Sequence, residues 1–143
     1  METRHLPTEI NLHQRSRVLE ITFDDGARFR LPCEYLRVAS PSAAVRGHSA
    51  QTARLQVGKE RVGITRLEQV GAYAVKVYFD DGHNSGLYDW QYLYQLGRDW
   101  PARWQDYLGR LAAAGHQREG PDPFDDLLAR GESPSELPPT AAI

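Results

Sequence analysis

The sequence predicts an α+β domain: a small antiparallel sheet built from β-hairpins, short helices packed on it, and a disordered C-terminal tail. The hairpins are indicated by the tetrapeptide FDDG, which occurs at 23–26 and again at 79–82, each time after alternating apolar and polar residues. An Asp-Gly turn next to alternating segments is a strong hairpin signal. The helices are indicated by apolar residues at helical spacing in 99–115.

The first hairpin is expected over 17–32. Apolar residues alternate with polar ones on both sides of its turn: Leu19, Ile21, Phe23, Phe29 and Leu31. Segment 8–14 before it is predicted to be a short strand. After it, Pro32 suits the start of a helix that is broken at Ser40-Pro41, and Ser42 can cap a second short turn through Val45.

The second half repeats this order of elements. A strand is expected within 61–71 and a hairpin over 72–88, with these side chains facing inward: Tyr73, Val75, Val77, Phe79 and Leu87. A helix then covers 89–97, where Gly97 is expected to form a left-handed cap. A longer helix follows over 99–115, with a proline in its first turn and Gly115 at its end.

The folded domain is predicted to span 1–116 and the tail 117–143. The tail carries five of the nine prolines and more acidic than basic residues. Such a composition buries too little apolar surface to offset its ordering entropy, so we expect it to be mostly disordered. The exception is 122–131, where Asp122 can cap a short helix and Phe124, Leu127 and Leu128 share one face. This helix either docks on a partner or folds back on the domain.

The bulk composition excludes several classes of protein. With 143 residues, 41% hydrophobic, 25% charged and a net charge of −2, the chain resembles an ordinary soluble domain without a general attraction to nucleic acid. A single cysteine allows no internal disulfide and no all-cysteine metal cage, which suits a reducing compartment. No apolar run is long enough to span a membrane, and no signal-peptide pattern is present. A cytoplasmic location is predicted.

Polar and glycine residues concentrate in the loops, where binding sites usually lie. Phosphate-loop, nucleophile-elbow and paired-cysteine zinc motifs are all missing, which favours a binding module over an enzyme. The candidate ligand- or partner-binding residues are Arg37, Ser40, Ser42, Arg46, Gly47, His48, Tyr88 and Trp90. The turn residues Asp81 and His83 can instead act as metal ligands if His48 completes the set. The alternative for both aspartates of each FDDG is turn chemistry alone.

Several blocks of sequence carry a resemblance to a known family: LPCEYLR, SPSAAVRGH, FDDGHNSGLYDW and YLYQLG. Over about residues 9 to 115 the chain resembles the DUF971 family, also described as the N-terminal domain of γ-butyrobetaine hydroxylase-like proteins, and in particular its stand-alone bacterial members. In eukaryotic hydroxylases for γ-butyrobetaine and trimethyllysine, this domain precedes a catalytic domain that uses 2-oxoglutarate and iron(II). Related domains also occur with Mrp-type ATPases that carry iron–sulfur clusters.

The resemblance also implies a structural zinc site, held in the hydroxylases by three cysteines and one histidine. The histidine matches His83, whereas the cysteine positions fall at Ser40, Ser42 and Val45. Hydroxyl groups are poor zinc ligands, so the resemblance argues against an intact zinc site. The 27 residues of the tail are also too few for a dioxygenase domain. We therefore expect no cofactor and no hydroxylase activity from this chain alone.

Three functional hypotheses follow. The favoured one is a non-catalytic binding or adaptor module that recognises a protein partner in iron–sulfur or iron-enzyme metabolism. The alternative is a protein that binds zinc or iron through His83, His48 and Asp81. A weaker alternative is nucleic-acid binding through four basic residues of one loop and strand: Arg54, Lys59, Arg61 and Arg66.

Overall fold

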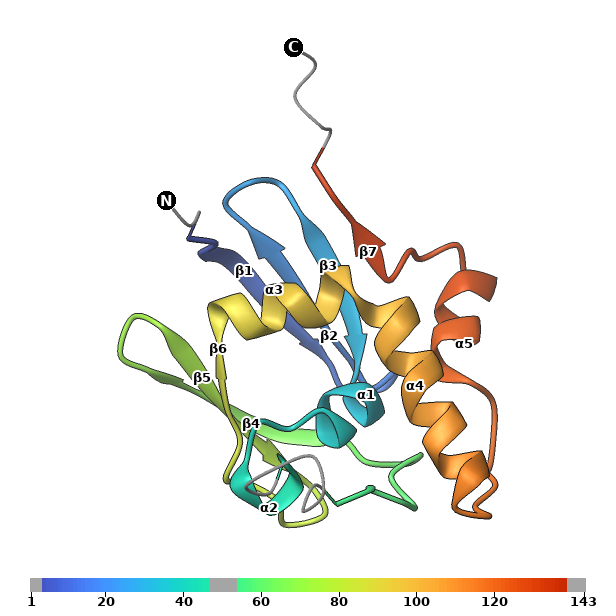
Figure 1. Ribbon diagram of the computed structural model, residues 1–143. Coiled ribbons are helices and arrows are strands. Elements are labelled where there is room, and N and C mark those ends of the chain that lie inside the picture. The colour runs from blue at the N-terminus through green and yellow to red at the C-terminus, as the bar shows by residue number, and fades with distance from the viewer. Residues whose placement is uncertain (1–3, 47–53, 139–143) are drawn as a thin grey trace.

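The computed structural model describes residues 4–46 and 54–138 (Figure 1). Their strands form two antiparallel sheets. The first has the order β1-β2-β3-β7, with β1 at Pro7–His13, β2 at Val18–Phe23, β3 at Arg28–Pro32 and β7 at Ser135–Glu136. The second has the order β4-β5-β6, with β4 at Ile64–Val70, β5 at Ala74–Phe79 and β6 at Leu87–Asp89. The predicted α+β class and antiparallel hairpins are confirmed.

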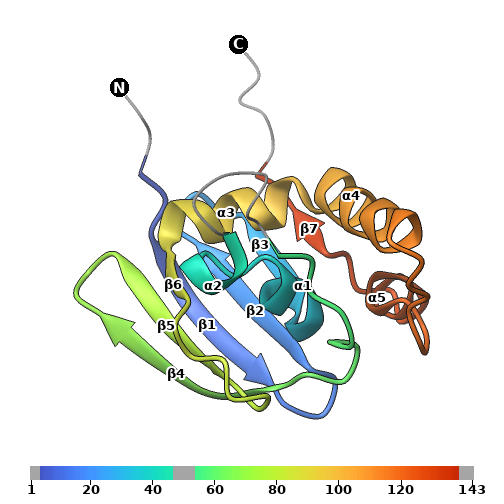
Figure 2. The same cartoon turned by 60° about the horizontal axis from the view of Figure 1, so that its bottom comes forward.

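The strands form two sheets where a single sheet was expected, and the free edge of β3 pairs with the C-terminal strand β7, not with the second hairpin. The helices are α1 at Cys33–Val38, α2 at Ala43–Arg46, α3 at Trp90–Arg98, α4 at Trp100–Ala113 and α5 at Pro123–Ala129. Helices α1 and α3 lie across one face of the first sheet (Figure 2). That face supplies much of the core through Leu19, Ile21, Phe23, Phe29 and Leu31. No helix among the described residues is long and apolar enough to cross a membrane.

The two FDDG segments form the same turn. Gly26 and Gly82 have φ values of 93° and 89°, in the left-handed region that favours glycine. In each turn the second aspartate accepts a backbone hydrogen bond from two residues further on: Asp25 from the N–H of Ala27 at 2.9 Å, and Asp81 from that of His83 at 3.1 Å. The turn chemistry predicted from the sequence is therefore confirmed, although Asp81 has further partners.

Three local predictions, for Leu87, Tyr73 and Gly97, were wrong. Leu87 is 38% exposed, whereas Tyr88 is fully buried, because Tyr88 is the β6 residue that pairs with the buried Val75. Tyr73 is likewise exposed and precedes β5.

Gly97 is not a left-handed cap but lies within α3, where a side chain would overlap the ring of Phe29. Glycine is used here for close approach of α3 to β3, not for a turn.

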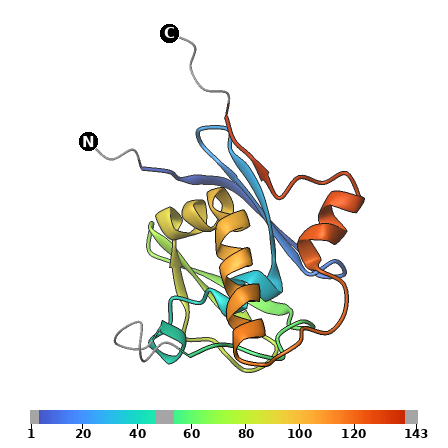
Figure 3. The same cartoon turned by 45° about the vertical axis from the view of Figure 1, so that its right-hand side comes forward.

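The expected disorder of the C-terminal segment does not hold for residues 117–138. Asp122 caps α5, as predicted, and also accepts a hydrogen bond from Trp104 Nε1 at 2.8 Å. The Phe124 ring stacks on Trp100 with centroids 4.3 Å apart, and Leu127 is buried beside it, whereas Leu128 is exposed. Figure 3 shows α5 beside α4. The few apolar residues of this segment meet an aromatic surface of α4, which the composition alone does not reveal.

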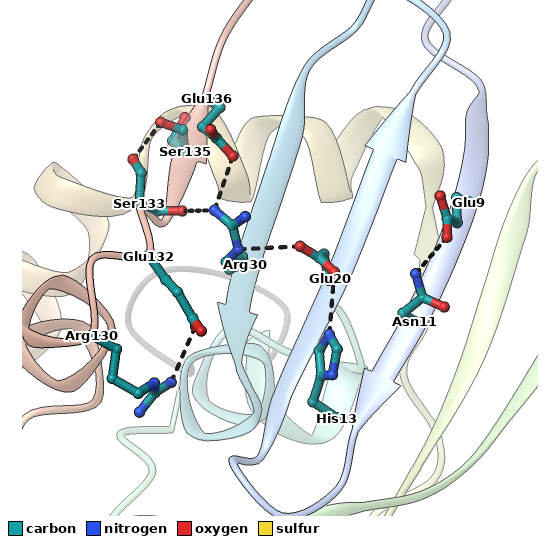
Figure 4. Close-up of polar contacts among 10 residues, drawn as sticks. All are labelled: Glu9, Asn11, His13, Glu20, Arg30, Arg130, Glu132, Ser133, Ser135 and Glu136. Atoms are coloured by element: carbon teal, nitrogen blue, oxygen red, sulfur yellow. Dashed lines mark hydrogen bonds and ion pairs between the residues drawn. The ribbon is translucent and has the colours of Figure 1, made fainter.

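Ion pairs complete the attachment of this segment. Arg118 forms two hydrogen bonds with Glu34, at 2.7 and 2.5 Å, and Glu34 is only 3% exposed. Arg30 donates to the carbonyl of Ser133 at 2.8 Å and to the carboxylate of Glu136 at 2.9 Å, as Figure 4 shows. The acidic residues that favoured disorder are thus partly neutralised by arginines of the domain and the segment itself. The helix over 122–131 folds back on the domain.

Candidate functional site

A polar network joins the end of α1 to the second FDDG turn. Arg37 is 6% exposed, and its Nε donates to Asp81 Oδ2 at 2.8 Å. Lys59 Nζ donates to the same oxygen at 2.7 Å. Burial raises the pKa of Asp81, but the hydrogen bonds from Lys59, Arg37 and the His83 backbone outweigh it and lower that pKa to about 2. Asp81 is therefore ionised and held between two cations.

Two serine contacts extend this network. Ser40 Oγ lies 2.8 Å from His83 Nε2, and Ser42 Oγ lies 2.6 Å from Ser85 Oγ. Burial and the positive charge of Arg37 lower the pKa of His83, so its imidazole is neutral at pH 7. Ser40, Ser42 and His83 thus come together as the resemblance implied, but as a hydrogen-bonded cluster of neutral groups.

A serine next to a neutral histidine raises the question of nucleophilic catalysis. Ser40 is only 1% exposed, so a substrate cannot reach its hydroxyl without rearrangement. Asp81 hydrogen-bonds to the backbone N–H of His83 and not to its ring, so it does not orient the imidazole as the acid of a triad does. The pair therefore fits a structural role.

The metal hypothesis gains no support from the two ligands that the structure describes. Both Asp81 oxygens are engaged by hydrogen-bond donors, and His48 lies outside the described residues. Within 4–46 and 54–138, the group of three possible ligands that comes within metal-binding distance is His5, Asp24 and Asp25, in another part of the chain. The zinc site that the resemblance to the hydroxylases implies does not fit either, because Ser40 beside His83 offers a hydroxyl oxygen in place of a thiolate.

A second feature lies beside this network: a cavity of about 200 Å³, which we call the arginine pocket. Helices α1, α2, α3 and α4 contribute to its lining. Its charged and aromatic lining includes Arg46, Arg54, Arg103, Arg110, Asp106 and Tyr92. Ser40 also lines it, so the pocket and the polar network share a residue.

The ring of Tyr92 organises one side of the arginine pocket. The guanidinium carbons of Arg46 and Arg103 lie 4.7 and 5.7 Å from its centroid, which is the range of cation–π contacts. The Tyr92 hydroxyl donates to the carbonyl of Ala39 at 2.5 Å, which ties the ring to the end of α1. Tyr92 therefore positions two cations at once.

None of the four arginines of the pocket forms an ion pair with a carboxylate of the described residues. Arg103 and Arg110 are seven residues apart on α4, which places them on one face of that helix. Arg54 is brought close to Arg46 because its backbone N–H donates to the carbonyl of Val45 at 2.9 Å. The pocket is a concentration of positive charge with one acidic residue, Asp106, in its lining.

The structure sorts the predicted site residues into four groups. Arg46 lines the arginine pocket, whereas Arg37, Ser40 and Ser42 belong to the buried network beside it. Tyr88 and Trp90 are core residues, and each donates a hydrogen bond to a backbone carbonyl, of Leu36 and Ala72 respectively, so the prediction that they present a binding surface was wrong. Gly47 and His48 lie outside the described residues.

Sequence reasoning did not single out Tyr92, Arg103 or Arg110 as site residues. The signal was present in the helix pattern, because the two arginines flank the buried stripe of α4 formed by Trp104, Tyr107 and Leu111. Arginines at that spacing are also common on a solvated helix face. Only the approach of α2 and Arg54 to α4 shows that these two arginines line a pocket and do not simply lie on a solvated helix face.

Comparison with known proteins identifies the family. A model described as γ-butyrobetaine hydroxylase-like, N-terminal, matches residues 10–94, more than half of the chain. The chain belongs to this family. The matched range includes Arg46, Arg54 and Tyr92 and ends before α4. A search of curated proteins gave no significant match.

Solved structures of similar sequence share the fold. An NMR solution structure with 43% identity covers 84% of this chain and 94% of its own, with a TM-score of 0.72. A second NMR solution structure with 46% identity covers 83% of this chain and 89% of its own, with a TM-score of 0.71. A crystal structure of a DUF971 protein of unknown function from Acidithiobacillus ferrooxidans has 40% identity, covers 63% of this chain and 90% of its own, and gives a TM-score of 0.54.

Proposed function

We propose that this domain is a non-catalytic binding module that recognises an acidic partner protein through the face around the arginine pocket. The observation that carries the proposal is the convergence of four arginines that lack carboxylate partners among the described residues. Cations that converge in this way repel one another, and a negatively charged partner relieves that repulsion. Electrostatic complementarity of this kind raises association rates and selects partners.

The polar network supports this surface by fixing its base. Arg37, Asp81 and Lys59 join the end of α1 to the second turn, and Ser40 links them to the wall of the pocket. Arg46 and Arg103 are already held against Tyr92 before any partner arrives. A surface that is ordered in advance loses less side-chain entropy on binding.

Of the four basic residues that the nucleic-acid hypothesis names, two are paired with carboxylates and a third lines the arginine pocket. Lys59 is paired with Asp81 at 2.7 Å, and Arg66 with Glu68 at 2.9 Å. Arg54 instead belongs to the arginine pocket. Because the chain resembles domains found with iron(II)-dependent hydroxylases and with ATPases that carry iron–sulfur clusters, an iron-dependent enzyme or an iron–sulfur protein is the partner class to test first.

The proposal is tested by affinity capture from a lysate of the source cells, followed by quantitative mass spectrometry. The variant Arg46→Glu/Arg103→Glu reverses two charges of the pocket, and Arg15→Glu/Arg28→Glu is the matched control at exposed positions elsewhere. We expect acidic proteins captured by the natural chain to be lost with the first variant and retained with the second. Retention of the same proteins by both variants would refute the role of the pocket.

A further inference from the structure

The size of the arginine pocket restricts what it can hold. Pockets for drug-sized ligands occupy about 300–1,000 Å³, whereas this cavity is about 200 Å³. It therefore suits a compact group, or the end of a larger molecule, more than a whole cofactor. With four arginines and one aspartate in the lining, the group must be anionic.

The directions from which the arginines come distinguish between anions. Arg46 comes from the end of α2, Arg54 from the segment before β4, and Arg103 and Arg110 from two levels of α4. A planar carboxylate accepts one bidentate guanidinium along its edge. A tetrahedral phosphoryl group presents its oxygens in several directions and carries up to two negative charges, so it can satisfy arginines that surround it.

The pocket also has the preorganisation that anion recognition needs. Besides the contacts of Tyr92 with Arg46 and Arg103, the hydroxyl of Tyr107 donates to the carbonyl of Gln56 at 2.7 Å, which anchors the segment that carries Arg54 to α4. The buried residues Tyr35 and Val45 supply an apolar part of the lining. Charge-assisted hydrogen bonds are stronger next to such low-dielectric surroundings.

On these grounds we propose that the arginine pocket is a phosphoryl-binding site that takes a phosphate or diphosphate group. The proposal rests on the proposed function in that it assigns the same face to recognition, and it names the chemical group recognised. That group can belong to a phosphorylated side chain of the partner or to a free phosphorylated small molecule. Both sources present the same oxygens to the arginines.

The test is a calorimetric titration of the full chain with pyrophosphate, inorganic phosphate and citrate at one ionic strength. We expect saturable binding of pyrophosphate, and binding of citrate that is weaker by about tenfold despite its similar charge. The variant Arg103→Gln/Arg110→Gln, which removes charge with little change of size, should weaken pyrophosphate binding by about tenfold or more. The control Arg15→Gln/Arg28→Gln should bind as the natural chain does, and amide NMR spectra check that both variants are folded.

Three results would overturn the proposal: no saturable pyrophosphate binding, citrate binding as tight as pyrophosphate binding, or equal loss in the control variant. A phosphoserine peptide and its unphosphorylated counterpart distinguish the sources. A peptide that binds more tightly than pyrophosphate indicates a phosphorylated partner, and the reverse order indicates a small molecule; both support the phosphoryl site. Pocket-dependent capture of partners without pyrophosphate binding would leave the proposed function standing and refute this inference alone.

Discussion

Replacement of Gly97 by alanine tests the packing of α3 against β3. A Cβ at this position would overlap the ring of Phe29, with three of the ring atoms at 2.7 Å or less. Phe29 is fully buried, and its ring is in edge-to-face contact with the rings of Phe23 and Tyr94, at 5.8 and 5.1 Å. The ring cannot move aside without displacing these neighbours.

Two opposing effects determine how much Gly97→Ala changes the free energy of unfolding. Overpacking of a core costs about 1–3 kcal/mol, and alanine has a helix propensity about 1 kcal/mol better than glycine. Because the overlap involves the buried ring and not the end of a flexible side chain, we expect the upper part of that range and a net loss of about 1–2 kcal/mol in the free energy of unfolding. The matched control is Gly109→Ala in α4, where a Cβ meets nothing within 4 Å. This control should gain about 1 kcal/mol.

The assay is urea unfolding followed by tryptophan fluorescence, with the midpoint and the slope fitted for each variant. The two substitutions should shift the midpoint in opposite directions at an unchanged slope. If Gly97→Ala raised the midpoint as Gly109→Ala does, the contact with Phe29 would not limit position 97. The close approach of α3 to β3 would then not require a glycine at this position.

Further predictions concern charged groups. The folded-state pKa of Asp81 is about 2, below its ordinary 3.8, so the stabilisation by its ionised form is present above pH 4 and is lost as the pH falls towards 2. Because the residue is partly exposed, we expect this contribution to the free energy of unfolding to be about 1 kcal/mol. Urea midpoints measured across this pH range should show the loss in the natural chain and not in Asp81→Asn. Glu34→Gln removes the partner of Arg118 and should lower the free energy of unfolding by about 3 kcal/mol, again measured by urea unfolding. Loss of the exposed Arg130–Glu132 pair should lower it by less than about 0.5 kcal/mol. Elemental analysis of untagged protein should find less than about a tenth of an equivalent of zinc, and the same low content in His83→Ala. A full equivalent of zinc would contradict the interpretation of Ser40, Ser42 and His83 as a hydrogen-bonded cluster without metal.

Local turn chemistry could be predicted from the sequence because it depends on neighbouring residues. Both FDDG turns and the Asp122 cap are determined within a few positions, and all three have the predicted geometry. Gly97 was misinterpreted because a glycine at a helix end usually marks a cap, and only the distant Phe29 reveals another reason for it. Composition likewise could not show that Phe124 meets the rings of Trp100 and Trp104.

The candidate site was predicted in part. The proximity of Ser40 to His83 follows from the family resemblance, and the structure confirms it. The arginine pocket depends on an approach of α2 to α4 that no spacing in the sequence encodes. Tyr88 and Trp90 were misassigned because aromatic residues beside a loop suit a binding surface and a core equally well, and the strand register decides between them.

The pairing of β7 with β3 has a consequence for how the chain is made. Arg30 and Ser133, which are joined by a hydrogen bond, are separated by 103 residues in the sequence. During synthesis the edge of β3 therefore remains open until nearly the whole described chain has emerged from the ribosome. Open strand edges are the surfaces through which nascent chains aggregate or exchange strands. The short C-terminal strand thus closes the sheet last and protects an edge that the earlier hairpins leave exposed.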